Sequence, residues 1–169
     1  QVKTSLLWSY QKTNKRTAFL NLSKNLFAIF EAKPDKYQHA LAVLNTEMGR
    51  FYAYDKQQLA IQHYQTAHRL YLQKYDEDSP VLKTLYSLIG IHYYQQQETD
   101  LAIYYFQKTI FIAHKHHATH IIHPYNYMNL ANCYERKEAF SQAHHHMQKA
   151  LDLALEREGE QNEVVAVIH

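Results

Sequence analysis

The sequence is poor in the residues that bend or cross-link a chain. Its 169 residues include three glycines, three prolines and one cysteine. So few turn-forming residues disfavour a β-rich fold with many tight turns and favour long helices. The single cysteine, Cys133, excludes an internal disulfide and fits a reducing compartment, so we expect a cytoplasmic protein. Because Cys133 lies in an apolar helical pattern, we interpret it as a buried small side chain and not as a nucleophile.

Long apolar runs and an excess of one charge are missing too. No run approaches the ~18 apolar residues that a membrane-spanning helix needs, and no signal peptide is visible. The 18 basic and 16 acidic side chains nearly balance, which gives no reason to expect a nucleic-acid surface. Hydrophobic residues make up 46% of the chain, which argues against disorder. We therefore expect one globular domain over residues 1–169 that contacts neither a membrane nor a nucleic acid.

Motifs of common reaction centres are absent as well. The sequence contains no Gly-rich phosphate loop, nucleophile elbow, H-E-x-x-H or paired cysteines. The acidic run 76–78 lacks the alternating ligands and downstream Glu of an EF-hand, and it resembles a helix-start cluster, where negative charge suits the helix dipole. We therefore predict no enzyme activity, no catalytic residue and no cofactor.

Histidine, by contrast, is abundant, with 13 residues, and its clusters raise the question of a metal site. His116 and His120 are four residues apart, and His117 and His120 are three apart, so either pair could share one face of a continuing helix. However, no Cys or carboxylate completes a ligand shell nearby, and the consecutive histidines at 144–146 point in three directions on a helix. We therefore expect solvated helix ends and predict no metal site.

The main feature that is present is a repeat. Three stretches align without gaps, each with a small or flexible residue, an aromatic three positions later, and then Ala, a large apolar and a small residue at +12, +16 and +19. They are Met48, Phe51, Ala60, Tyr64, Ala67; Gly90, Tyr93, Ala102, Phe106, Thr109; and Ala131, Tyr134, Ala143, Met147, Ala150. These spacings place the residues on one face of each of two helices. The alanines let the two antiparallel helices approach closely, while the large residues fill the next groove.

This pattern resembles the tetratricopeptide repeat, and the second copy, "LYSLIGIHYYQQQETDLAIYYFQKT", resembles it closely. The period is 42 residues from Met48 to Gly90 and 41 from Gly90 to Ala131, against ~34 in the usual repeat. Longer variants of this kind are known in kinesin light chains and in bacterial peptide-sensing (quorum-sensing) transcriptional regulators, whose C-terminal domain this chain resembles. The resemblance implies an all-α fold, a right-handed α-solenoid of antiparallel helix pairs.

Proline and glycine mark the element boundaries. Pro34 ends one helix before the next, Pro80 and Pro124 suit first helical positions, and Gly159 suits a helix end. We predict helices at 16–31, 36–53, 57–75, 80–96, 99–116, 124–137 and 141–158. We place repeats at about 1–33 (degenerate), 36–75, 80–117 and 124–158, with a further helix starting at 162–169. Because "SLLWSY" and "NEVVAVIH" look like parts of first helices, we expect the chain to be a piece of a longer solenoid.

The resemblance also implies a binding groove, because the first helices of this family line a concave surface that holds extended peptides. The family's groove positions give eight residues that we predict to bind a peptide: Asn45, Tyr52, Ser87, Tyr94, Met128, Asn129, Asn132 and Arg136. Asn can donate and accept at once and can therefore hold a peptide backbone, and Tyr adds apolar contact at modest entropic cost. The alternative interpretation is that Asn129 and Asn132 only satisfy neighbouring helices. Arg136 is the one cation among these positions, which disfavours the Lys and Arg clamp of chaperone-tail-binding members.

Three functions are consistent with such a groove. The first is the ligand-sensing part of a bacterial transcriptional regulator, in which a short peptide shifts the population of conformations. It predicts a basic helix-turn-helix upstream. The alternative is a general protein–protein interaction adaptor without a DNA-binding role, and a third function is a regulatory domain attached to an enzyme. In each case the partner is a short peptide or a protein segment in the concave groove. A homodimer stays open.

Overall fold

The computed structural model describes residues 16–116 and 123–158. The chain divides into two compact units, Gln1–Glu77 (unit 1) and Asp78–His169 (unit 2). Within its described part, each unit consists of helices and their connections, without a strand. Four predicted features lie outside the described residues: the "SLLWSY" stub, the pairs involving His117 and His120, the helix end at Gly159 and the further helix at 162–169.

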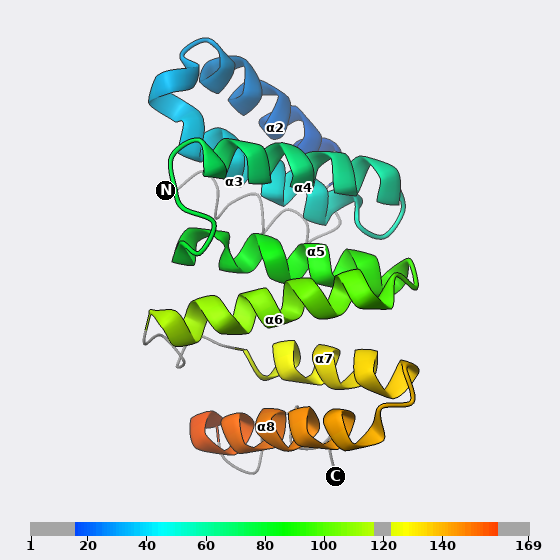
Figure 1. The fold of residues 1–169 in the computed structure, drawn as a ribbon. Helices are drawn as coiled ribbons and strands as arrows, with labels where there is room; N and C mark the ends of the chain where they lie inside the picture. Colours follow the sequence, from blue (N-terminus) through cyan, green and yellow to red (C-terminus); the bar gives the residue numbers. More distant parts are fainter. Residues whose placement is uncertain (1–15, 117–122, 159–169) are drawn as a thin grey trace. The chain divides into compact units, whose positions relative to one another are not determined.

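The described part of unit 1 contains three helices, α2 (Arg16–Glu31), α3 (Pro34–Tyr52) and α4 (Gln57–Leu72). α3 packs against both α2 and α4 (Figure 1). Pro34 occupies the first turn of α3, where its missing N–H group would have no partner in any case. The predicted helices 16–31, 36–53 and 57–75 agree with these bounds to within three residues.

Unit 2 begins with a 3₁₀ turn, η1 (Pro80–Leu82), and continues with α5 (Lys83–Gln95), α6 (Thr99–Lys115), α7 (Pro124–Arg136) and α8 (Phe140–Glu158). Each helix packs against the next one along the chain (Figure 1). The His123 ring caps α7, because its Nδ1 accepts the backbone N–H of Tyr125 at 3.3 Å. The predicted all-α fold of sequential antiparallel helix pairs is confirmed. In the described part of the chain, no helix has both the length and the apolar character needed to cross a bilayer.

In the pairs α3–α4 and α5–α6, a glycine of the first helix faces an aromatic ring of the second. A Cβ atom added to Gly49 would lie 2.3 Å from Cε1 of Tyr64, and one added to Gly90 would lie 2.7 Å from Cε1 of Phe106. Both rings are buried in the core, so they cannot move aside without disturbing their neighbours. A side chain at either glycine would therefore push the two helices apart.

This contact corrects the sequence alignment, which matched Met48 with Gly90. Gly49 is the true equivalent of Gly90, because each faces the central ring of its partner helix. The first helices therefore repeat after 41 residues, whereas the rings Tyr64 and Phe106 are 42 residues apart. The alignment of this one helix was wrong by one position.

The pair α3–α4 has one residue fewer than the pair α5–α6 between the glycine and the ring, and the difference lies around the end of the first helix. α3 ends at Tyr52, but α5 continues for two residues beyond Tyr93, the equivalent of Tyr52. The connection 53–56 is one residue longer than the connection 96–98. Together, the two differences leave the first pair one residue shorter. The turns α5–α6 and α7–α8 share a conformation that the turn 53–56 lacks, with Gln97 and Glu138 at positive φ of 65° and 59°.

α3 of unit 1 and α7 of unit 2 also pack against the helix that precedes them. In unit 1 this seam is formed by Phe19, Leu26, Leu44, Met48 and Phe51 of α2 and α3, with the Phe19 and Phe51 rings stacked at 4.3 Å between centroids. In unit 2 it is formed by Ala102, Phe106, Leu130 and Cys133 of α6 and α7. A first helix therefore uses two faces for packing and keeps a third face for other contacts.

Inside each pair, one ring of the second helix lies between two side chains of the first helix that are seven residues apart. His146 of α8 stacks between Tyr127 and Tyr134 of α7, with centroids 6.2 and 5.3 Å apart. Tyr105 of α6 lies beside Tyr86 and Tyr93 in the same way. In unit 1 the equivalent ring is that of His63. Its Nδ1 forms a hydrogen bond with Oδ1 of Asn45 at 2.9 Å, and the ring stacks on Tyr52.

Burial lowers the pKa of both His63 and His146, and the neighbouring His145 lowers that of His146 further. The Nδ1 atom of His146 is also buried without a hydrogen-bond partner in the described structure. A protonated imidazole carries two N–H donors that need acceptors. The pair α7–α8 therefore favours a neutral His146 ring.

We predict that Gly90→Ala lowers the free energy of unfolding by about 1–3 kcal/mol, because the added methyl group overlaps the buried Phe106 ring. In an open helix the same change would stabilise by about 0.5–1 kcal/mol, so the sign of the effect tests the contact. The third pair carries Ala131 and Met147 at these positions. Adding Phe106→Met to Gly90→Ala should therefore recover part of the loss in a double-mutant cycle measured by urea denaturation. Two additive losses would contradict the pairing of Gly90 with Phe106.

We predict that His146→Tyr reduces the pH dependence of stability. The variant carries the same residue as Tyr105, which holds the equivalent position in the pair α5–α6. The folded-state pKa of His146 is lowered, so the unfolded chain takes up the proton first as the pH falls. The wild type should therefore lose stability between about pH 7 and pH 5, and the variant should lose less. Urea denaturation at both pH values measures this difference. Gln142→Tyr adds the same ring at an exposed position of α8 and should behave like the wild type.

Candidate ligand-binding face

The first helices of the two complete pairs of unit 2, α5 and α7, are joined at both ends by polar contacts. Near one end, Ser87 Oγ donates to Oδ1 of Asn126 at 2.8 Å. Near the other, Arg136 Nη1 donates to the Tyr94 carbonyl oxygen at 2.9 Å. The guanidinium carbon of Arg136 also lies 4.0 Å from the centre of the Tyr94 ring, a cation–π contact. These contacts fix α5 and α7 side by side.

The surface between these contacts is the third face of the two helices. We name it the α5–α7 face, and it consists of Ser87, Ile91, Tyr94, Asn129, Asn132 and Arg136. Spacings of three and four residues place these side chains along one line on each helix. Arg136 is exposed and the other five are half-buried. The α5–α7 face therefore offers an apolar centre, two amides and one cation to a ligand.

The amides of Asn129 and Asn132 are available to form hydrogen bonds with a ligand. Neither side chain takes part in a hydrogen bond in the structure as described. An amide carries two donors and an acceptor, and half-buried polar groups gain by pairing with a partner. The interpretation in which these two residues only satisfy neighbouring helices therefore has no hydrogen bond to support it.

Arg136 supplies the positive charge of the face. One of its five N–H donors is used by the Tyr94 carbonyl, and the stacking on Tyr94 holds the guanidinium plane in place. The remaining donors can reach an acceptor of a bound ligand, most strongly a carboxylate. The next residue, Lys137, is already paired with Asp100.

The structure brings together five of the eight predicted residues on this face: Ser87, Tyr94, Asn129, Asn132 and Arg136. Met128 lies at its edge, half-buried against Ala154 of α8. Whether any of them contacts a ligand stays a prediction.

Asn45 and Tyr52 belong to unit 1 and lie in the seam between α3 and α4. Asn45 is 5% exposed, donates to the Leu41 carbonyl at 2.9 Å and bonds His63, while Tyr52 stacks on His63. The one-residue shift of α3 explains this, because they correspond to Tyr86 and Tyr93, which face α6.

The shift also identifies the residues of α3 that are equivalent to Ser87 and Ile91, which sequence reasoning missed. They are Thr46 and Arg50, 41 residues earlier, although Thr46 is buried and donates to the Ala42 carbonyl oxygen. Arg50 pairs with Glu47 at 3.5 Å between Nη1 and Oε1. Burial raises the pKa of Glu47, against the opposing effect of Arg50. The first pair therefore does hold a cation at such a position, although an ion pair occupies it.

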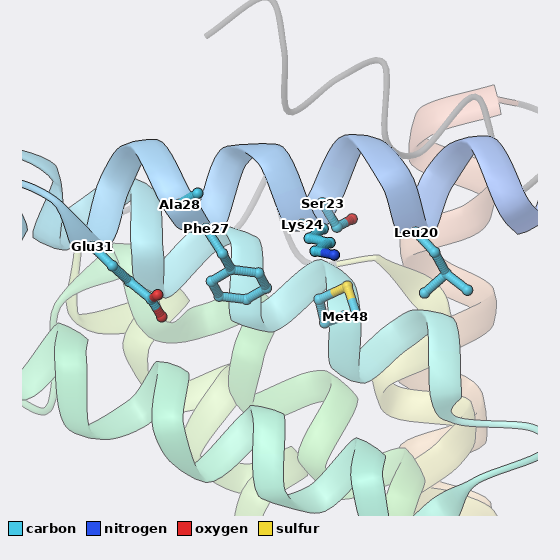
Figure 2. Close-up of a pocket in the computed structure, with 7 residues that line it drawn as sticks. All are labelled: Leu20, Ser23, Lys24, Phe27, Ala28, Glu31 and Met48. Carbon is cyan, nitrogen blue, oxygen red and sulfur yellow. The ribbon is translucent and has the colours of Figure 1, made fainter.

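A pocket that the sequence did not predict lies along α2 in unit 1, with a volume of about 430 Å³. Figure 2 shows its lining, which is Leu20, Ser23, Lys24, Phe27, Ala28 and Glu31 of α2 with Met48 of α3. Spacings of three and four residues along α2 are the signal in the sequence, and they differ from the repeat positions used in the alignment. Lys24 and Glu31, two turns apart, are its charged members.

Two other histidines, at the C-terminal end of α6, contact neighbouring segments. His116 Nε2 lies 2.9 Å from the Asp78 carbonyl oxygen, and His114 Nε2 lies 3.2 Å from the Tyr127 hydroxyl. Within 16–116 and 123–158, no group of three or more His, Cys, Asp or Glu side chains is placed to hold a metal ion.

A family model for the tetratricopeptide repeat matches residues 38–113. This segment begins within α3 and ends within α6, so it covers most of the pairs α3–α4 and α5–α6, whose sequence matches the tetratricopeptide repeat. No curated protein sequence matches the chain significantly.

Among solved structures, BtubC (BKLC) from P. vanneervenii matches 96% of this chain with a TM-score of 0.69 at 18% identity. This chain covers 62% of that one. At such identity the likeness shows the fold alone. It is not a likeness to a peptide-sensing regulator, so it gives that role no support.

We predict that Cys133 is unreactive in the folded protein. Its side chain is buried between α6 and α7, and burial raises the pKa of its thiol to about 11, against a smaller opposing effect of Arg136. Because only the thiolate is nucleophilic, labelling by a disulfide reagent near pH 8 should be at least about 100-fold slower than for free cysteine. Urea should restore the normal rate, whereas fast labelling of the native protein would contradict the buried α6–α7 seam.

Proposed function

We propose that this chain is a protein–protein interaction module that binds an extended segment of a partner polypeptide on the α5–α7 face. The observation that carries the proposal is the pair of amides, Asn129 and Asn132, held without partners beside Ile91 on a surface whose two helices are already fixed. A rigid surface loses little entropy on binding. Stacked helix pairs of this kind form recognition surfaces rather than reaction centres, so the module has no catalytic role.

The chemistry of the face defines the segment that it would bind. Amides that donate and accept suit the backbone of an extended chain, Ile91 and Tyr94 suit an apolar side chain, and Arg136 suits an acidic group or a chain-terminal carboxylate. The same proposal places the module in the cytoplasm, in keeping with its single buried cysteine.

The peptide-sensing regulator differs from this adaptor in the length of the ligand. A sensor binds a short free peptide, whereas an adaptor needs a longer segment of a partner. The tetratricopeptide repeats support interaction with a polypeptide in both cases, and no observation on the structure favours DNA-linked regulation. A full-length reading frame with a basic helix-turn-helix upstream would revive the sensor.

The test is a selection from a displayed library of linear peptides, followed by titration of the selected peptides. We expect Asn129→Ala/Asn132→Ala to weaken binding by about 10-fold or more, because each lost amide hydrogen bond costs about 1 kcal/mol. Gln142→Ala/Lys149→Ala on α8 changes two exposed side chains in the same unit and should leave the affinity unchanged. Equal effects of the two double variants, or none, would exclude the α5–α7 face as the binding site.

A further inference from the structure

The outer side of α6 carries large apolar side chains that its own chain leaves uncovered. Leu101, Tyr104 and Phe111 are 42%, 50% and 54% exposed. With Lys108 they occupy positions i, i+3, i+7 and i+10, which fall within one narrow stripe along a helix. We name these four residues the α6 stripe. It lies opposite the side that packs in the core, which carries Ala102 and Phe106.

The α6 stripe is particular to the middle repeat. The positions that correspond to Tyr104 and Phe111 are Gln62 and Arg69 on α4, and His145 and Asp152 on α8. Of the apolar residues of the stripe, only Leu101 has an apolar equivalent in α4, which is Leu59. The apolar stripe is therefore not required by the repeat, because α4 and α8 use polar residues there. Exposed apolar side chains gathered on one helix mark an interaction surface.

The charge on the α6 stripe limits which partner surfaces can bind to it. It contains one ionised group, Lys108, whose Nζ lies 3.3 Å from the Tyr104 hydroxyl oxygen and 5.5 Å from the centre of the Tyr104 ring. The same Nζ lies 5.1 Å from the centre of the Tyr86 ring. The lysine therefore already associates with aromatic rings in this chain, and a partner surface that offers another ring suits it equally well.

The order of residues along the stripe is symmetric. The four positions are spaced evenly about Phe106, with Leu101 and Phe111 five residues away on either side and Tyr104 and Lys108 two residues away. If two copies of α6 meet antiparallel about a twofold axis at this level, Leu101 faces the partner's Phe111 and Tyr104 faces the partner's Lys108. Each apolar group then meets an apolar group, each ammonium meets a ring, and no two lysines oppose each other.

We propose that the α6 stripe is the interface through which two copies of this chain form an antiparallel twofold dimer. Closed twofold pairing is the commonest form of self-association, and it requires such a self-complementary patch. One helix from each copy makes a small interface, so the dimer belongs to the weak and reversible class. The α5–α7 face lies on the first helices and takes no part in it, so self-association and ligand binding are separate properties.

The test is sedimentation equilibrium at concentrations from about 10 μM to about 1 mM, the range in which small interfaces associate. The wild type should approach twice the monomer mass as the concentration rises. Leu101→Asp should weaken the dimer at least about 10-fold, because it buries a charge against the partner's Phe111. Leu59→Asp is the matched control, since it changes the equivalent third residue of α4 and should leave dimerisation unchanged.

The arrangement of the copies is tested by cross-linking. Leu101→Cys mixed with Phe111→Cys should form a disulfide between the two variants faster than either variant forms one with itself, and the buried Cys133 should not compete. A wild type that stays monomeric over the whole range would overturn the proposal. So would a dimer equally sensitive to both aspartate variants, or equal cross-linking of like and unlike copies. Circular dichroism of each variant confirms that it is folded, and peptide binding on the α5–α7 face is measured independently.

Discussion

The contact between a glycine and an aromatic ring determines how the pairs α3–α4 and α5–α6 are built. Gly49 and Gly90 leave room for the buried rings of Tyr64 and Phe106, and this sets how closely and in which rotation the two helices meet. Once that rotation is fixed, the other two faces of the first helix follow from helix geometry. One contacts the preceding second helix, as Leu44 and Met48 contact α2, and the other carries the side chains shown to a ligand.

The sequence predicted this architecture well because helical periodicity and proline positions are local signals. Helix bounds agreed within a few residues, and the packing of Ala102 and Phe106 followed from their spacing. The error was also local. The alignment without gaps was anchored on Ala60, Tyr64 and Ala67 of the second helix, which are correctly matched. It carried their 42-residue offset over to the first helix and therefore matched Met48 with Gly90. Where the first helix ends depends on the turn 53–56, whose geometry its sequence does not state.

The candidate site shows the same limit. In unit 2 the register was right, and Asn129, Asn132 and Arg136 lie on one face with Ser87 and Tyr94. In unit 1 the shift of one residue turned Asn45 and Tyr52 by about 100° into the seam with His63. The pocket along α2 and the exposed stripe of α6 were not predicted, because the repeat pattern describes residues that pack and is silent about those that do not.

The difference of one residue between the pairs α3–α4 and α5–α6 has a wider meaning. It arises around the end of α3 and the connection 53–56, and a glycine faces an aromatic ring in both pairs despite it. A length difference at a helix connection therefore changes the residue numbers of the ligand-facing side chains, but not the face of the helix on which they lie. Homologous arrays of different lengths can accordingly keep one specificity, and arrays of equal length can differ in theirs. Comparing relatives by the glycine, rather than by a constant period, is what would reveal which of them share a ligand.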